Sequence, residues 1–87
     1  MILDRTTIKN LSRSALKVYL TLTEFDLGNG VGMRMKELSE ISGVSLRHVR
    51  RCLDLLEISD LIEIDPVYWP TGGIAMNHYR LVREDER

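Results

Sequence analysis

The sequence has 87 residues, which is enough for one small domain with a thin hydrophobic core. Its formal net charge is −1, so the charge balance does not indicate nucleic-acid binding, and any such argument depends on where the charges lie. No apolar run approaches the roughly 20 residues of a membrane span. The N-terminus lacks the apolar segment of a signal peptide and Cys52 is the single cysteine, so we expect a cytoplasmic protein without an internal disulfide.

The first predicted elements are a helix and a short strand. Residues 13–25 carry apolar side chains at helical spacing, and Ser12 or Ser14 can cap the helix. The "GNG" sequence at 28–30 ends it. Residues 31–36 alternate in apolar character, which predicts a short strand. The predicted apolar stripe of the helix consists of Leu16, Tyr19, Leu20 and Thr23.

Two more helices follow, separated by a tight turn. The "KELSEISG" stretch at 36–43 predicts a short helix with Leu38 and Ile41 on one face and Gly43 as its C-cap. Ser45 then caps a third helix, which ends near residues 57–59. Its inward stripe has the spacing of a buried helix face. The residues of this stripe are Val49, Cys52, Leu53 and Leu56.

The C-terminal third of the chain predicts a β-hairpin. Ile62 and Ile64 alternate with acidic residues, a second alternating run follows at 74–82, and Pro70 and the Gly72–Gly73 pair between the two runs are turn residues. We therefore expect a mainly α fold with a small antiparallel β-sheet, in the order α-β-α-α-β-β. The chain is predicted to form one domain over 1–87, with an N-terminal arm at 1–10, a core at 11–83 and a tail at 84–87.

Positive charge is concentrated near the start of the third helix. The inward stripe leaves Arg47, Arg50 and Arg51 facing outward, where cations oppose the helix dipole. Arg47 also lies three and four residues from the other two, and like charges at these spacings repel by about 0.2–0.5 kcal/mol each. The acidic residues Asp54 and Glu57 come later, at the equally unfavourable C-terminal end. This arrangement favours contact with a polyanion, because phosphate and guanine both prefer arginine.

The second and third helices, joined by the turn at Gly43, form a helix-turn-helix motif, whose second helix enters the major groove of DNA. With this motif in place, three stretches of the sequence resemble winged-helix domains of plasmid and phage replication proteins and, more loosely, MarR-type regulators. The stretches are "LSRSALKVYLTLTEF", "MKELSEISGVSLRHVRRCLDLLEISDLIEI" and "NHYRLV". The resemblance covers residues 11–83 and implies DNA binding, with the third helix in the major groove and the hairpin as a wing.

The candidate DNA-binding residues lie on three elements. The N-terminal part of the third helix is placed to reach base edges, although His48 alone is better explained as a packed residue on its flank. Cations near the start of the second helix suit phosphate, and an ordinary solvated surface is the alternative for them. Glycine amides at the hairpin tip can also meet phosphate. The full candidate set is Ser45, Leu46, Arg47, His48, Arg50, Arg51, Arg34, Lys36, Gly72, Gly73 and Arg80.

The hairpin tip is unusual for a wing because it carries no Arg or Lys before Arg80. We expect Trp69 to fold back onto the small core or to pack against Tyr79. The alternative is that Trp69 contacts the sugar-phosphate backbone or a protein partner.

Taken together, these features predict sequence-specific binding of double-stranded DNA, in transcription regulation or in plasmid or phage replication or partition. A homodimer or multimer on DNA would supply affinity that one small module lacks. The alternative function is a protein-interaction winged helix that uses the apolar wing and does not bind DNA. We predict no catalytic residue, cofactor or metal, since His48, His78 and Cys52 lack the close, paired spacing of zinc ligands.

Overall fold

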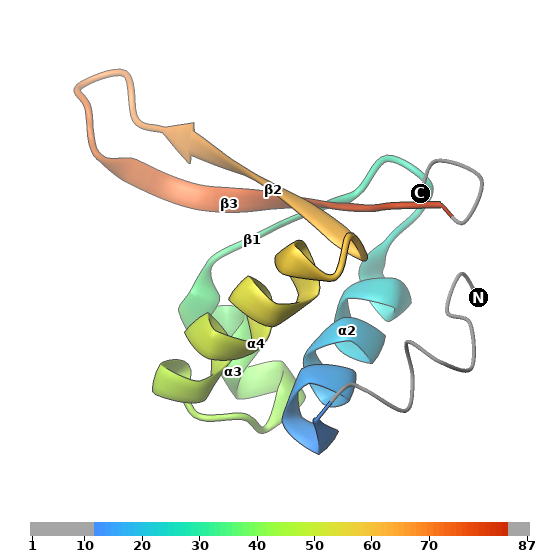
Figure 1. The fold of residues 1–87 in the computed structure, drawn as a ribbon. Coiled ribbons are helices and arrows are strands. Elements are labelled where there is room, and N and C mark those ends of the chain that lie inside the picture. The colour runs from blue at the N-terminus through green and yellow to red at the C-terminus, as the bar shows by residue number, and fades with distance from the viewer. Residues whose placement is uncertain (1–11, 84–87) are drawn as a thin grey trace.

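The computed structural model describes residues 12–83, which form three helices and a three-stranded antiparallel sheet (Figure 1). The predicted order of helices and strands is confirmed. The predicted arm at 1–10 and tail at 84–87 lie outside the described residues. In chain order the elements are α2 (Arg13–Phe25), β1 (Val31–Met33), α3 (Met35–Ser42), α4 (Leu46–Ile58), β2 (Ile62–Tyr68) and β3 (Ile74–Leu81).

Helix α2 begins at the predicted N-cap Ser12, whose Oγ accepts a hydrogen bond from the N–H of Ala15 at 3.1 Å. Of the predicted stripe, Tyr19 is fully buried and Leu16 and Thr23 are half-buried, whereas Leu20 is wrong, because its side chain is 36% exposed. The packing of α2 against α4 and α3 buries the face on the other side of Tyr19, which carries Ala15, Val18 and Leu22. The fully buried residues of α2 are Ala15, Val18, Tyr19 and Leu22.

Strand β1 ends at Met33, so the strand predicted over 31–36 is too long. The N–H of Arg34 donates a hydrogen bond to Oε1 of Glu37 at 3.3 Å, which favours the start of a helix at this point. Leu38 supplies the fully buried side chain of α3. The prediction that Ile41 lies on the same buried face is wrong, because its side chain is 49% exposed.

A three-residue turn joins α3 to α4 and bears out the predicted caps. Gly43 has a φ of 75°, and its N–H donates to the carbonyl oxygen of Ser39 at 3.0 Å. The hydroxyl of Ser39 donates to the carbonyl oxygen of Val44 at 2.6 Å, and Val44 itself is buried in the angle between the two helices. Ser45 is the N-cap of α4. The predicted inward stripe of α4 is confirmed, since Val49, Cys52, Leu53 and Leu56 are all buried.

Strand β3 is the central strand of the sheet, in the order β1-β3-β2. Strand β1 pairs only with its middle, from Val31 opposite Tyr79 to Met33 opposite Asn77. Strand β2 follows β3 as far as Tyr68, which lies opposite Ile74. The distal half of the β2–β3 hairpin therefore extends beyond β1 and projects past the helices (Figure 1). The proximal half closes the core through the fully buried Tyr79.

Replacement of Gly30 by alanine tests how closely the chain approaches β3 just before β1 begins. Gly30 has a φ of 84°, and an added Cβ would lie 2.7 Å from the carbonyl oxygen of Tyr79 and 2.6 Å from Cε1 of His78. We expect Gly30→Ala to lower the free energy of unfolding by about 2 kcal/mol or more, from backbone strain and the clash together. Urea denaturation measures the loss.

The matched control for this substitution is Gly28→Ala. Gly28 also has a positive φ, 108°, but nothing lies within 4 Å of an added Cβ. It should lose only the strain component, about 1 kcal/mol. Equal losses at the two positions would contradict the close approach of Gly30 to β3.

Candidate nucleic-acid interface

The exposed face of α4 carries the predicted cations. Because its inward stripe is buried, the first two turns expose Arg47, Arg50 and Arg51 to solvent. Helical spacing places Arg47 and Arg51 at the centre of the outward face and Arg50 on one flank. Leu46, at the start of the helix, is 42% exposed, and His48 lies on the opposite flank, as predicted, with its side chain exposed.

These three arginines form no ion pair within residues 12–83, although Asp54 follows Arg50 and Arg51 by one turn of α4. None of their guanidinium groups takes part in a hydrogen bond or an ion pair there. The first turn of α4 contains no acidic residue, and its last turn contains no basic one. Both ends of the helix therefore carry charges that its dipole disfavours, and an external anion would relieve the N-terminal part.

Ser45 holds the first turn of α4 and orients His48. The Oγ of Ser45 accepts the backbone N–H of His48 at 3.4 Å and lies 2.8 Å from Nδ1 of the same residue. The imidazole is thereby held against the cap, next to the arginines.

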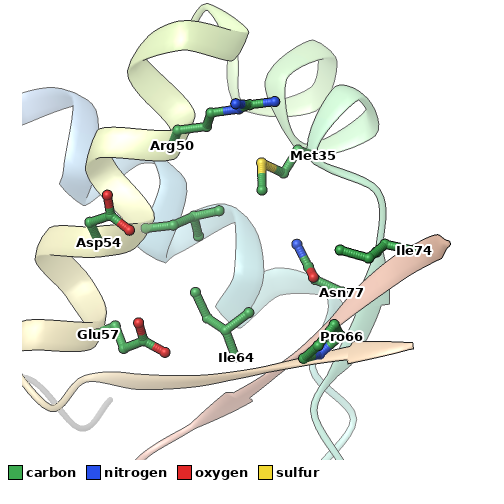
Figure 2. Close-up of a pocket in the computed structure, with 9 residues that line it drawn as sticks. Met35, Arg50, Asp54, Glu57, Ile64, Pro66, Ile74 and Asn77 are labelled. Atoms are coloured by element: carbon green, nitrogen blue, oxygen red, sulfur yellow. The ribbon is translucent and has the colours of Figure 1, made fainter. Parts of the chain in front are cut away.

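A groove separates α4 from the hairpin (Figure 2). Its volume is about 550 Å³. Arg50 reaches across one end of it towards the start of α3, whereas Asp54 and Glu57 lie along the same side of α4 further on. The floor is mostly apolar, so an anion entering the groove would be attracted at the Arg50 end and repelled at the other. The remaining lining residues are Met35, Leu53, Ile64, Pro66, Ile74 and Asn77.

The structure brings Arg34 close to this end of the groove. Arg34 and Arg50 both line a second hollow of about 270 Å³ that adjoins the first. Lys36 is exposed on the first turn of α3. Two of the three cationic elements predicted from the sequence thus converge beside the N-terminus of α3, although Glu37 also lies in that first turn.

The hairpin tip carries the two predicted glycines but no cation. Gly72 and Gly73 have φ values of 98° and 76°, and the N–H of Gly72 donates to the carbonyl oxygen of Trp69 at 2.9 Å. Trp69 is 52% exposed, so the prediction that it folds onto the core or packs against the buried Tyr79 is wrong. The reason is that the tip projects past the helices and finds no core to cover.

Arg80 does not join the other candidate residues. It lies at the base of the hairpin, opposite Glu63 on β2, and forms a salt bridge with that carboxylate. Its charge is therefore compensated within the sheet, unlike the charges of the α4 arginines.

The groove itself was not predicted from the sequence. Its lining residues come from α3, α4, β2 and β3, and only the packing of the hairpin beside α4 brings them together. No local signal in the sequence marked it: Asn77 is a polar residue at a buried strand position, where its Nδ2 donates to the hydroxyl of Tyr79 at 3.3 Å, and only the structure shows that burial and that partner.

Residues 12–83 contain no group of three or more His, Cys, Asp or Glu side chains that could hold a metal ion. Burial raises the pKa of the Cys52 thiol, which disfavours the reactive thiolate. None of the helices in the same range has the length and apolar character needed to cross a bilayer.

Comparison with known proteins returns no relative. No family model matches the chain, and no curated protein or solved structure is significantly similar to it. The geometry of α4 and the groove therefore carries the functional inference.

The Ser45 cap can be tested by substitution. We expect Ser45→Ala to lower the free energy of unfolding by about 1 kcal/mol, because the first turn of α4 loses its acceptor. Ser45→Asp, which keeps an acceptor, should be close to wild type. Urea denaturation compares the three proteins, and equal stability of Ser45→Ala and wild type would show that the cap does not hold α4.

Proposed function

We propose that this protein is a winged-helix protein that binds double-stranded DNA sequence-specifically. In this proposal α3 and α4 are the helix-turn-helix, α4 is the recognition helix in the major groove, and β2 and β3 form the wing. The single observation that carries the proposal is the set of three exposed arginines on the first two turns of α4, which form no ion pair within residues 12–83.

The proposed division of labour follows from position on the helix. Arg47 and Arg51, at the centre of the outward face, are directed at base edges, where guanine offers two acceptors to one guanidinium. Leu46 can contact a thymine methyl group. Arg50, beside the groove, is placed between bases and the phosphate backbone.

Phosphate contacts would set the register of the protein on the duplex without reading sequence. Arg34 and Lys36, with the N-terminus of α3, form the group best placed to do this beside Arg50. Of the two predicted glycines at the hairpin tip, Gly73 is the better placed to offer a backbone amide, because the N–H of Gly72 donates to the carbonyl oxygen of Trp69. Arg80 is the least suited of the predicted residues to contact phosphate, because its guanidinium is paired with Glu63.

The biological setting is proposed by resemblance: transcription regulation, or plasmid or phage replication or partition, without catalytic activity. The test uses two duplexes, one from the region immediately upstream of the protein's own gene and one of unrelated sequence.

Arg50→Ala combined with Arg51→Ala should abolish detectable binding to the upstream duplex at physiological salt. Each lost arginine contact to a base or phosphate is expected to cost about 1–3 kcal/mol, or roughly tenfold to a hundredfold in affinity. Fluorescence anisotropy over a salt series measures both the affinity and its salt slope, which should fall in magnitude by about 1, for the phosphate contact of Arg50.

The matched control removes the same charge from elsewhere. Arg13→Ala combined with Lys17→Ala deletes two exposed cations of α2, away from α4, and should leave binding nearly unchanged. Equal loss in both double variants would mean that net charge alone is responsible, and unchanged binding in the α4 variant would reject the assigned surface.

A second candidate function is a protein-interaction winged helix that does not bind DNA. The observation in its favour is the exposed apolar hairpin tip with Trp69, together with the net charge of −1. Binding through that tip would depend weakly on salt, whereas DNA binding weakens steeply as salt rises.

A further inference from the structure

The central strand of the sheet extends beyond β1 and has a free edge there (Figure 1). Strand β1 pairs with β3 only from Tyr79 to Asn77, whereas β3 begins at Ile74. Within residues 12–83, no strand lies along the β1 side of residues 74–76, while β2 pairs with their other side. An unpaired strand edge presents a row of backbone N–H and C=O groups to a partner. We call the β1 side of residues 74–76 the open edge.

The open edge borders a hollow that carries positive charge. Residues 74–76 line the hollow of about 270 Å³ together with Arg34, Arg50, Met35 and Asn77 (Figure 2). No acidic residue lines it, although Glu37 accepts the backbone N–H of Arg34 close by. Both arginines are exposed, and neither forms an ion pair within residues 12–83. The hollow therefore offers two guanidinium groups to an anionic side chain beside the open edge.

The opposite edge of the sheet is less suited to strand addition. Strand β2 forms that edge, and Pro66 within it has no N–H to donate. Asp65, next to this proline, is exposed and would repel an acidic segment. Residues 74–81 contain no proline. The open edge is therefore the part of the described sheet where an added acidic strand meets both backbone partners and opposite charge.

The chemistry of a strand edge favours a peptide as the occupant. Such an edge offers donors and acceptors together, so a partner must carry both at strand spacing. A peptide backbone does, whereas the phosphate oxygens of DNA and the carboxylate of a small ligand only accept hydrogen bonds. The two arginines add a preference for acidic side chains.

We propose that the open edge binds an extended acidic peptide of a partner protein, which adds to the sheet as a strand in line with β1. Main-chain hydrogen bonds provide the pairing, and side chains provide the specificity. Because side chains alternate along a strand, every second one points towards the helices, where Arg34 and Arg50 receive a carboxylate. The intervening side chains share the other face with Met76, since its neighbour Asn77 is the buried one.

The open edge is short, so the peptide gains few main-chain hydrogen bonds and binds weakly, over roughly 10 μM to 1 mM. The proposed function gives the same two arginines to the DNA backbone, so the peptide and a duplex would compete for them. This competition rests on the proposed function, whereas the peptide contact itself does not.

Titration of the isotope-labelled whole chain with a synthetic peptide, followed by nuclear magnetic resonance, tests the proposal. The probe is a peptide of alternating valine and glutamate with blocked ends. The backbone amide signals of residues 74–76 should shift as the probe is added. Those amides that turn towards β1 should also exchange more slowly with solvent, because they become hydrogen-bonded.

Two altered probes separate pairing from charge. The same peptide with methylated backbone nitrogens keeps its carboxylates but cannot pair as a strand, and it should leave the signals of residues 74–76 unchanged. A peptide of alternating valine and lysine can pair but should be repelled by the two arginines, so it should bind more weakly than the glutamate probe.

Variants of the protein localise the contact. Arg34→Ala combined with Arg50→Ala should bind the glutamate probe about tenfold more weakly, because two exposed ion pairs are lost. The control, Arg13→Ala combined with Lys17→Ala, removes the same charge from exposed positions of α2 and should bind as wild type does. The urea midpoint checks that both variants fold.

Three results would overturn the proposal: no shift at residues 74–76 up to about 1 mM probe, equal binding of the methylated peptide, or equal loss in the two double variants. Equal binding of the methylated peptide would assign the hollow to carboxylates alone, and shifts caused only by a DNA duplex would assign the edge to DNA. Peptide binding in a protein that binds neither duplex would support the contact and reject the proposed function, so the two failures are distinguishable.

Discussion

The burial of Val49, Cys52, Leu53 and Leu56 is the constraint on which the rest of the structure depends. These side chains fix the rotation of α4 about its axis against α2 and the sheet. Rotation of α4 about its axis by one residue position would move Arg50 into the core. An unpaired charge there costs several kcal/mol. The rotation is therefore held by the apolar stripe and by charge together, and it determines which residues α4 can offer to a partner.

The charge of the exposed surface of α4 also changes sign along the helix. Its arginines lie in the first two turns, and Asp54 and Glu57 follow along the groove. A phosphate chain is attracted at one end of the helix and repelled at the other, so a duplex can approach through the N-terminal part alone. This polarity explains how a chain with a net charge of −1 could bind DNA: the local field at the interface, and not the total charge, governs the approach.

The hairpin divides into two halves with different surroundings. Its proximal half carries the buried Tyr79 and the salt bridge of Arg80 with Glu63, and it belongs to the core and its border. Its distal half extends beyond β1, and its apolar side chains are exposed to solvent. This exposure costs free energy unless a partner covers them. In the proposed function, α4 is the part that reads DNA and the hairpin is the wing beside it.

The sequence by itself determined the features that depend on near neighbours along the chain. Ser45 and Gly43 cap helices through hydrogen bonds to residues three or four positions away, and the stripe of α4 follows from helical spacing alone. Tertiary structure decided whatever depends on distant residues. The buried face of α2, the exposure of Trp69 and the groove beside Arg50 each depend on which element packs opposite, and local spacing carries no information about that neighbour.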